Sequence, residues 1–309
     1  MKVLILNPVM QRDLHLFENR FIEAGIQTIC PPLKQFLTEA ELLPFMGTVD
    51  GVIAGDDEFS RRVLQAGLPR LKVISKWGVG LDSIDLEAAK EMGIPVFNSP
   101  GAFAIAVAEV ALGYMLMLSR HLSIVDSAVR GGAWPKPEGE GLRGKILGIV
   151  GYGAIGKAVG ERAAAFGMIV NAFDVMSAQM TAPTTGRFLS FEELCDTSDH
   201  ICLCCNLTDQ NYHLIDDASI RLMKNNPYII NVGRGPLVDE ESLIRALHSG
   251  DIQGAALDVY EVEPLPSGSE LNSFSNLILG SHNANNMTSA NSKVNVNTVN
   301  NLIDSLTGK

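Results

Sequence analysis

Three charged side chains in the second half of the sequence stand where they could bind an acid and move a proton. Arg234 lies between two glycines after the strand predicted at 228–232, so its planar guanidinium could bind a carboxylate or a keto oxygen. Glu263 and His282 follow the next two predicted strands, and a carboxylate beside an imidazole fixes the ring tautomer and favours its protonated form. We therefore expect a proton-transfer pair beside an acid-binding arginine; the alternatives are a surface arginine and a structural histidine.

A glycine-rich turn carries the second chemical signal. The apolar run 146–150 ends in Gly-Tyr-Gly-Ala-Ile-Gly, and a segment of helical periodicity follows directly. This pattern is typical of a strand, a tight turn and a helix whose N-terminus binds a pyrophosphate. The residues expected to form the cradle are Gly151, Gly153, Ala154, Ile155 and Gly156. An ordinary strand-to-helix turn is the alternative for such a motif alone.

An acid at a fixed distance from this turn indicates which dinucleotide binds. The apolar run 168–173 leads to Asp174, eighteen positions after Gly156. A carboxylate at that separation accepts hydrogen bonds from the ribose hydroxyls of NAD and repels the 2′-phosphate of NADP. We therefore predict that NAD is the cofactor.

A second pair of glycines marks a candidate anion site near the N-terminus. Gly78, Val79 and Gly80 follow the strand predicted at 71–75. Ligands of parallel sheets collect beyond the carboxyl ends of the strands, where backbone amides can hold a carboxylate. We expect the amides of Val79 and Gly80 to do so; an ordinary turn is the alternative.

Alternating strand and helix patterns must position all of these groups. Strands are expected at 3–6, 26–30, 51–55, 71–75, 146–150, 168–173, 228–232, 255–259 and 277–279, and the segment 194–203 is expected to be a helix end followed by a strand. Helical segments lie between most of these strands, including 212–223 and 240–249. Such alternation predicts α/β domains with parallel sheets and right-handed crossovers. The tail after 284 has helical spacing, and no strand follows it.

Composition narrows the class of partner. With a formal net charge of −11, the chain lacks the basic excess that nucleic acids and anionic membranes require. The segment 102–118 is apolar except for Glu109, but it is short for a membrane span, and we expect a buried helix. The five cysteines show no CxxC spacing, so we expect no metal site and a cytoplasmic protein.

Five sequence blocks together resemble the D-isomer-specific 2-hydroxyacid dehydrogenases, the family that includes phosphoglycerate dehydrogenase and glycerate/hydroxypyruvate reductase. The blocks are KWGVGLDSIDLEAAKEMGIPVFNSPG, AVAEVALGYMLMLSR, GKILGIVGYGAIGKAV, NVGRGPLVDEESLIRAL and GAALDVYEVEPLP. The resemblance implies two doubly wound parallel-sheet domains. A Rossmann NAD domain, residues 100–282, would be inserted into a flavodoxin-like substrate domain, residues 1–99 plus 283–309. It also implies a homodimer joined through the inserted domain.

The resemblance assigns roles by matching position. Arg234 would bind the substrate carboxylate and carbonyl oxygen, His282 would be the acid/base, and Glu263 its partner. The residues implied to contact the cofactor elsewhere are Val107, Thr208, Val232 and Asp258. Ser281 to Asn286 depart from the Pro-His and small-residue pattern usual in the family, so the mouth of the site is expected to be more polar.

The expected function is hydride transfer between the nicotinamide and C2 of a small D-2-hydroxy acid or 2-keto acid. The alternative is a nicotinamide-sensing protein of the corepressor type on the same fold. A sensor would need the segment from Gly151 to Asp174 but not a proton-transfer pair, so Arg234, Glu263 and His282 favour the enzyme.

Overall fold

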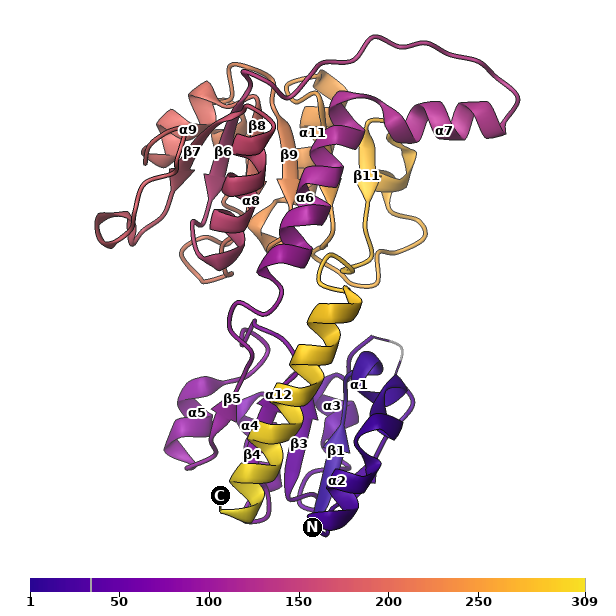
Figure 1. Ribbon diagram of the computed structural model, residues 1–309, viewed down its shortest axis with the longest axis vertical. Helices are drawn as coiled ribbons and strands as arrows, with labels where there is room; N and C mark the ends of the chain where they lie inside the picture. The colour runs from indigo at the N-terminus through magenta and orange to yellow at the C-terminus, as the bar shows by residue number, and fades with distance from the viewer. Residues whose placement is uncertain (34, 309) are drawn as a thin grey trace. The chain divides into compact units, whose positions relative to one another are not determined.

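The computed structural model describes residues 1–33 and 35–308, so Lys34 and Lys309 of the expected substrate domain lie outside the description. The chain forms two compact units (Figure 1). The first unit comprises Met1–Phe103 and Met287–Lys309, and the second comprises Ala104–Asn286. Both crossings between the units lie four residues later than the family resemblance had implied.

The first unit contains a five-stranded parallel sheet in the order β2-β1-β3-β4-β5. Its strands are β1 (Lys2–Ile5), β2 (Gln27–Ile29), β3 (Gly51–Ala54), β4 (Val73–Lys76) and β5 (Val96–Phe97). Its helices are α1 (Pro8–Arg12), α2 (Glu18–Glu23), α3 (Glu39–Leu42), α4 (Arg61–Gly67), α5 (Leu86–Glu91) and α12 (Thr288–Thr307). The strand order is the flavodoxin-like one, as predicted.

Alternating side chains explain why helices cover both faces of this sheet. In β4, Ile74 belongs to the core under α3, α4 and α5, whereas the hydroxyl of Ser75 donates to the backbone oxygen of Thr298 in α12 at 2.9 Å. Successive residues of a strand point to opposite faces, so β4 is buried on both sides. The C-terminal helix therefore belongs to the sheet built by the N-terminal residues.

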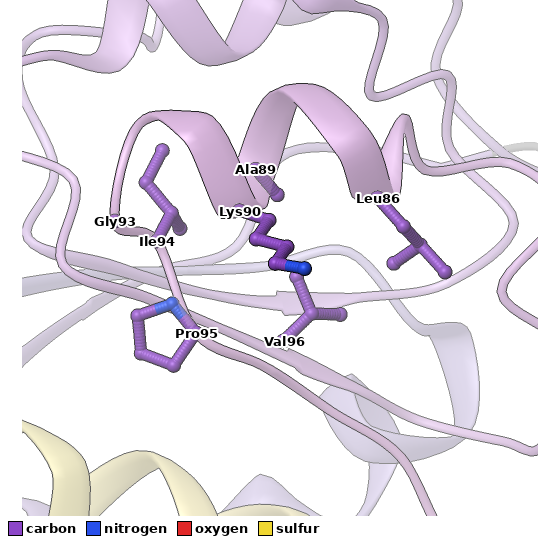
Figure 2. A pocket seen from close by; sticks show the side chains of 7 residues that line it. All are labelled: Leu86, Ala89, Lys90, Gly93, Ile94, Pro95 and Val96. Atoms are coloured by element: carbon purple, nitrogen blue, oxygen red, sulfur yellow. The ribbon is translucent and has the colours of Figure 1, made fainter.

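One surface hollow of the first unit lies between α5 and the approach to β5 (Figure 2). It has a volume of about 400 Å³ and is lined by Leu86, Ala89, Lys90, Gly93, Ile94, Pro95 and Val96. None of these is a predicted site residue. The lining of this hollow therefore includes none of the glycines that follow β4.

The second unit contains a six-stranded parallel sheet in the order β11-β10-β9-β8-β6-β7. Its strands are β6 (Ile146–Val150), β7 (Ile169–Phe173), β8 (His200–Leu203), β9 (Tyr228–Asn231), β10 (Gly254–Leu257) and β11 (Leu277–Leu279). Its helices are α6 (Ala104–Ser119), α7 (Leu122–Arg130), α8 (Ala154–Ala165), α9 (Phe191–Thr197), α10 (Asp217–Ile220) and α11 (Glu240–Ser249). A parallel bridge from Ala172 to Phe188 continues the sheet beyond β7. Counted with that bridge, the first strand β6 lies third from the edge, as in the Rossmann order.

Helix α6 is the apolar segment for which a membrane span was considered. Half of its residues are buried, among them Ala108, Ala111 and Met115, and it packs against α8, β9 and β10. Among the described residues, no single helix is long and apolar enough to cross a membrane; α6 and α7 pass that test only together, with a 67° bend between them.

Two segments differ from the sequence prediction. The segment 212–223 was expected to be helical, but only α10 forms there, because His213 has a φ of +52° and Asp216 caps the helix at the Ser219 amide. Helix α7 was not predicted. None of its residues is fully buried, although it contacts α6, so its apolar residues do not belong to a core of this chain.

A buried histidine in β8 makes the stability of the second unit sensitive to acid. His200 is 2% exposed, and its Nε2 lies 3.0 Å from the Ser119 hydroxyl at the end of α6. Burial lowers the pKa of His200 from 6.5 to about 4. The unfolded chain thus takes up a proton below pH 6.5 that the folded chain refuses, so stability present above pH 6.5 is lost as the pH falls toward 4.

We expect His200→Gln to remove this part of the acid sensitivity. Wild type should lose about 2 kcal/mol of unfolding free energy through His200 between pH 7 and pH 5. The loss of unfolding free energy between the two pH values should be smaller in the variant by this amount. Urea unfolding of both proteins at pH 7 and pH 5 measures the difference. Equal losses in wild type and variant would contradict the assignment.

Candidate active site

The glycine turn connects β6 to α8 in the predicted way. Gly151 has a φ of +90°, and a Cβ there would lie 2.6 Å from the Cys205 backbone. A Cβ on Gly156 would lie 2.1 Å from the Gly151 oxygen, so this glycine lets the first turn of α8 approach the strand end. Both positions therefore require glycine.

The residues at this turn fit a pyrophosphate. A Cβ on Gly153 would meet nothing within 4 Å, so the space in front of the turn is open among the described atoms. Gly153 is also the N-cap of α8 and has no side chain to accept from the first amides of the helix, which belong to Ala154 and Ile155. Such amides and the helix dipole favour an anion. The turn can thus hold a dinucleotide phosphate.

Asp174 lies directly beside the glycine turn. Its Oδ2 accepts from the Tyr152 amide at 2.7 Å, and its Oδ1 accepts from the Met176 amide at 2.8 Å. Each carboxylate oxygen has two acceptor sites, so one on each remains for a ribose hydroxyl. The acid that the spacing identified is therefore held against the cradle, and it fits the ribose of NAD.

His282 and Glu263 form the predicted pair. His282 Nδ1 lies 2.8 Å from Glu263 Oε2, and the side chains are 22% and 17% exposed. A carboxylate only accepts, so the proton between them belongs to Nδ1. The contact with Glu263 therefore engages Nδ1 rather than Nε2. The other Glu263 oxygen accepts from the Tyr260 amide at 3.1 Å, which fixes the carboxylate.

Asp258 holds the loop that carries His282. Its carboxylate accepts from the Asn283 amide at 3.2 Å, the Ala284 amide at 2.9 Å and the Tyr114 hydroxyl at 3.1 Å, and its backbone oxygen accepts from the His282 amide at 2.7 Å. His282 has a φ of +54°, which a residue with a side chain seldom adopts without such support. Asp258 thus shapes the backbone around the histidine.

Two tyrosines support the same loop, and the sequence analysis missed both. Tyr114 comes from α6, and Tyr260 donates to the Gly280 oxygen at 2.7 Å. Burial, followed by the charge of Asp258, raises the pKa of both hydroxyls, so they stay protonated donors. A Cβ on Gly280 would lie 2.3 Å from Asp258 Oδ1, so the loop can approach the Asp258 carboxylate this closely only because residue 280 is a glycine. No spacing in the sequence signals these contacts.

Arg234 follows β9 in a tightly constrained turn. Its backbone oxygen accepts from the Asn231 side chain at 2.8 Å, and its Nη1 donates to the Gly233 oxygen at 3.0 Å. A Cβ on Gly235 would lie 1.8 Å from the Tyr260 oxygen. The turn of Arg234 is therefore packed against the strand end that leads to Glu263.

The remaining predicted cofactor residues have different settings. The side chains of Val107 in α6 and Val232 after β9 are 5% and 7% exposed. Thr208 is exposed, and both its amide and its hydroxyl donate to Asn211 Oδ1, at 2.7 and 3.1 Å. Their contacts with a cofactor stay predictions. Val79 and Gly80 lie in the first unit, after β4.

The site combines three features: a Rossmann sheet, a glycine turn suited to a phosphate with an acid beside it, and a histidine–glutamate pair after later strands. Together they define the class of nicotinamide-dependent oxidoreductases. Comparison with known proteins narrows this class. Residues 112–284 match the model of the family described as "D-isomer specific 2-hydroxyacid dehydrogenase, NAD binding domain". The chain belongs to the D-isomer-specific 2-hydroxyacid dehydrogenase family.

Individual relatives agree with this assignment. The chain is 37% identical to a glyoxylate reductase of Thermofilum pendens over 262 residues, which are 82% of this chain and 77% of that protein. It is 39% identical to a hydroxypyruvate reductase of Thermotoga maritima over 234 residues, 75% and 76% of the two chains. The structure of D-lactate dehydrogenase from Aquifex aeolicus, complexed with NAD and lactic acid, superposes with a TM-score of 0.86 at 26% identity, covering 100% of this chain and 96% of that one.

These findings confirm the predicted activity and cofactor. The protein is an NAD-dependent oxidoreductase that transfers a hydride between the nicotinamide and C2 of a 2-hydroxy acid or 2-keto acid. All three relatives are named as reductases or dehydrogenases, so the comparisons give no support to a sensing protein.

Proposed function

We propose that this protein reduces a small 2-keto acid of the glyoxylate or hydroxypyruvate kind with NADH, and that His282 is its general acid. The hydrogen bond of 2.8 Å between His282 Nδ1 and Glu263 Oε2 carries the proposal, because it engages Nδ1 and so assigns proton exchange with the substrate to Nε2. Two of the relatives support the substrate class, since they are named glyoxylate reductase and hydroxypyruvate reductase.

The residues of the chain divide the remaining work. The turn from Gly151 to Gly156 and Asp174 would hold the cofactor, which as NADH would supply the hydride to C2 in reduction and as NAD⁺ would accept it in oxidation. His282 donates its Nε2 proton to the carbonyl oxygen during reduction and takes the hydroxyl proton during oxidation. Glu263 stabilises the protonated imidazole, since it is an anion in direct contact with Nδ1.

Substrate binding is proposed for two groups. Arg234 binds the carboxylate and carbonyl oxygen of the acid through its guanidinium, which is suited to such a planar partner. The backbone amides of Val79 and Gly80 bind the carboxylate. We further propose that Val107, Thr208, Val232 and Asp258 line the cofactor, as the family resemblance implies.

The test is NADH oxidation, followed by absorbance, with a panel of 2-keto acids. We expect turnover of glyoxylate or hydroxypyruvate and less of acids with large side chains. An active protein that prefers a bulky acid would correct the substrate class. NADH binding without turnover of any acid would sink the proposed reaction and restore the sensing alternative.

We also propose a cytoplasmic homodimer joined through the second unit. Helix α7 and the segment after it extend away from the sheet of that unit (Figure 1), with Trp134 78% exposed and Val129 42% exposed. A tryptophan so exposed is typical of a protein interface. The proposed cytoplasmic location is supported by the five cysteines, which are free thiols, as in a reducing compartment. The homodimer is tested by its mass. Light scattering should give twice the chain mass, and Trp134→Asp should lower it; a monomeric wild type would contradict the proposal.

A further inference from the structure

We propose that Asn98 orients the carboxylate-binding amides of Val79 and Gly80, and that Asn297 of α12 holds Asn98 in place for this task. The inference rests on the substrate role proposed above for Val79 and Gly80. All of the groups involved belong to the first unit.

The carbonyl groups of the loop after β4 are anchored on one side. The Gly78 oxygen accepts from the Ser99 amide at 2.8 Å, and the Val79 oxygen accepts from the Asn98 side-chain amide at 2.7 Å. Both anchors belong to the segment that follows β5. Two successive carbonyls of the loop therefore point toward that segment.

Peptide planarity converts these anchors into a direction for the amides. In a trans peptide the C=O of one residue and the N–H of the next point in opposite directions. The N–H groups of Val79 and Gly80 therefore both point away from Asn98 and Ser99. Gly78, with a φ of +141°, permits this conformation. Successive amides that point the same way form a concave site for an anion.

The amides themselves have no competing acceptor. Neither the Val79 nor the Gly80 N–H donates a hydrogen bond to any residue of the described ranges 1–33 and 35–308. A bound carboxylate would supply that acceptor. The Asn98 side chain, in contrast, donates to the Val79 carbonyl on the opposite side of the peptide from these amides, so it is a positioning residue.

The C-terminal helix holds the segment behind the loop. Asn297 Nδ2 donates to the Ser99 hydroxyl at 2.8 Å and lies 3.4 Å from the Asn98 backbone oxygen. Two residues earlier in α12, Asn295 Oδ1 accepts from the indole of Trp77 at 2.6 Å, directly before the loop. Both ends of this arrangement thus depend on α12.

The experiment compares Asn98→Leu, which removes the donor at nearly constant size, with the control Asn225→Leu. Asn225 also donates a side-chain amide hydrogen to a backbone oxygen, that of Thr197 at 3.1 Å, but in the second unit. Binding of oxamate, a 2-keto acid isostere that is not reduced, is measured by calorimetry on the protein loaded with NADH. We expect the oxamate Kd and the keto acid KM of Asn98→Leu to rise roughly 3- to 10-fold. Its NADH affinity and the control should stay at wild-type values.

A second variant tests the route through the helix. Asn297→Ala should raise the oxamate Kd in the same direction by a smaller factor, and the double variant should bind no more weakly than Asn98→Leu alone, because the two act through one contact. It also provides the test if Asn98→Leu does not fold. A purely structural role would lower Tm without changing the oxamate Kd.

The outcomes separate this inference from the proposed reaction. Wild-type oxamate affinity in folded Asn98→Leu and Asn297→Ala overturns the inference while turnover stands. Failure of the wild type itself to bind oxamate also overturns it. If wild type binds oxamate, the variants bind it more weakly, and no keto acid is reduced, the inference stands and the proposed reaction fails.

Discussion

His282→Asn is expected to lower kcat by about 10²- to 10⁴-fold, which is the usual contribution of a positioned general acid. Asparagine cannot protonate the carbonyl oxygen, but it tolerates the left-handed backbone that His282 adopts at a φ of +54°. The loop held by Asp258 should therefore keep its conformation. Stopped-flow or steady-state NADH oxidation measures the loss, and fluorescence titration should give an unchanged NADH Kd.

A second histidine–glutamate pair provides the matched control. His248 Nε2 lies 2.7 Å from Glu270 Oε1, but both side chains are more than half exposed. His248 lies in the last turn of α11, and the pair has no place in the proposed reaction. His248→Asn should therefore keep the wild-type kcat. A fully active His282→Asn variant would refute the assignment of the general acid.

Asp174→Ala is expected to weaken the preference for NADH over NADPH by roughly 10²-fold, because a like charge facing a phosphate costs several kcal/mol. The carboxylate lies beside the phosphate-binding turn, where its Oδ2 accepts from the Tyr152 amide. Removing it takes away both the ribose acceptor and the repulsion of a 2′-phosphate. The ratio of kcat/KM for the two cofactors measures the change.

Asp174→Ala also removes a backbone contact, so a control must remove a similar one. Asp199 accepts from the Ile146 amide at 2.7 Å, at the beginning of β6 rather than at its end. Asp199→Ala should lower stability without altering cofactor choice. Unchanged selectivity in Asp174→Ala would show that this acid does not read the ribose.

Much of the fold follows from local patterns. The strands predicted at 146–150 and 228–232 match β6 and β9 to within one residue, because a strand buried on both faces has a largely continuous apolar run. The prediction was wrong at 212–223, where capping by Asp216 and the backbone of His213 begin the helix later than its apolar spacing indicates.

The pair of His282 and Glu263 was also predictable, although the residues lie nineteen positions apart. Parallel strands place their carboxyl ends at one edge of the sheet, so residues in the loops that follow neighbouring strands come together. The same rule places Arg234, which follows β9, at this edge of the sheet. The strand order was therefore enough to predict that these groups lie at the same edge of the sheet, without any knowledge of side-chain contacts.

The sequence alone determined the order of strands and helices, the glycine turn with Asp174, and the chemical groups at the strand ends. These are properties of contiguous segments or of strand order. Only the tertiary structure decided which side chains hold those groups in place. Tyr114 reaches Asp258 across 144 positions, and Asn297 reaches Asn98 across 199. Such contacts depend on how each helix is rotated against its sheet, and no local periodicity records that rotation.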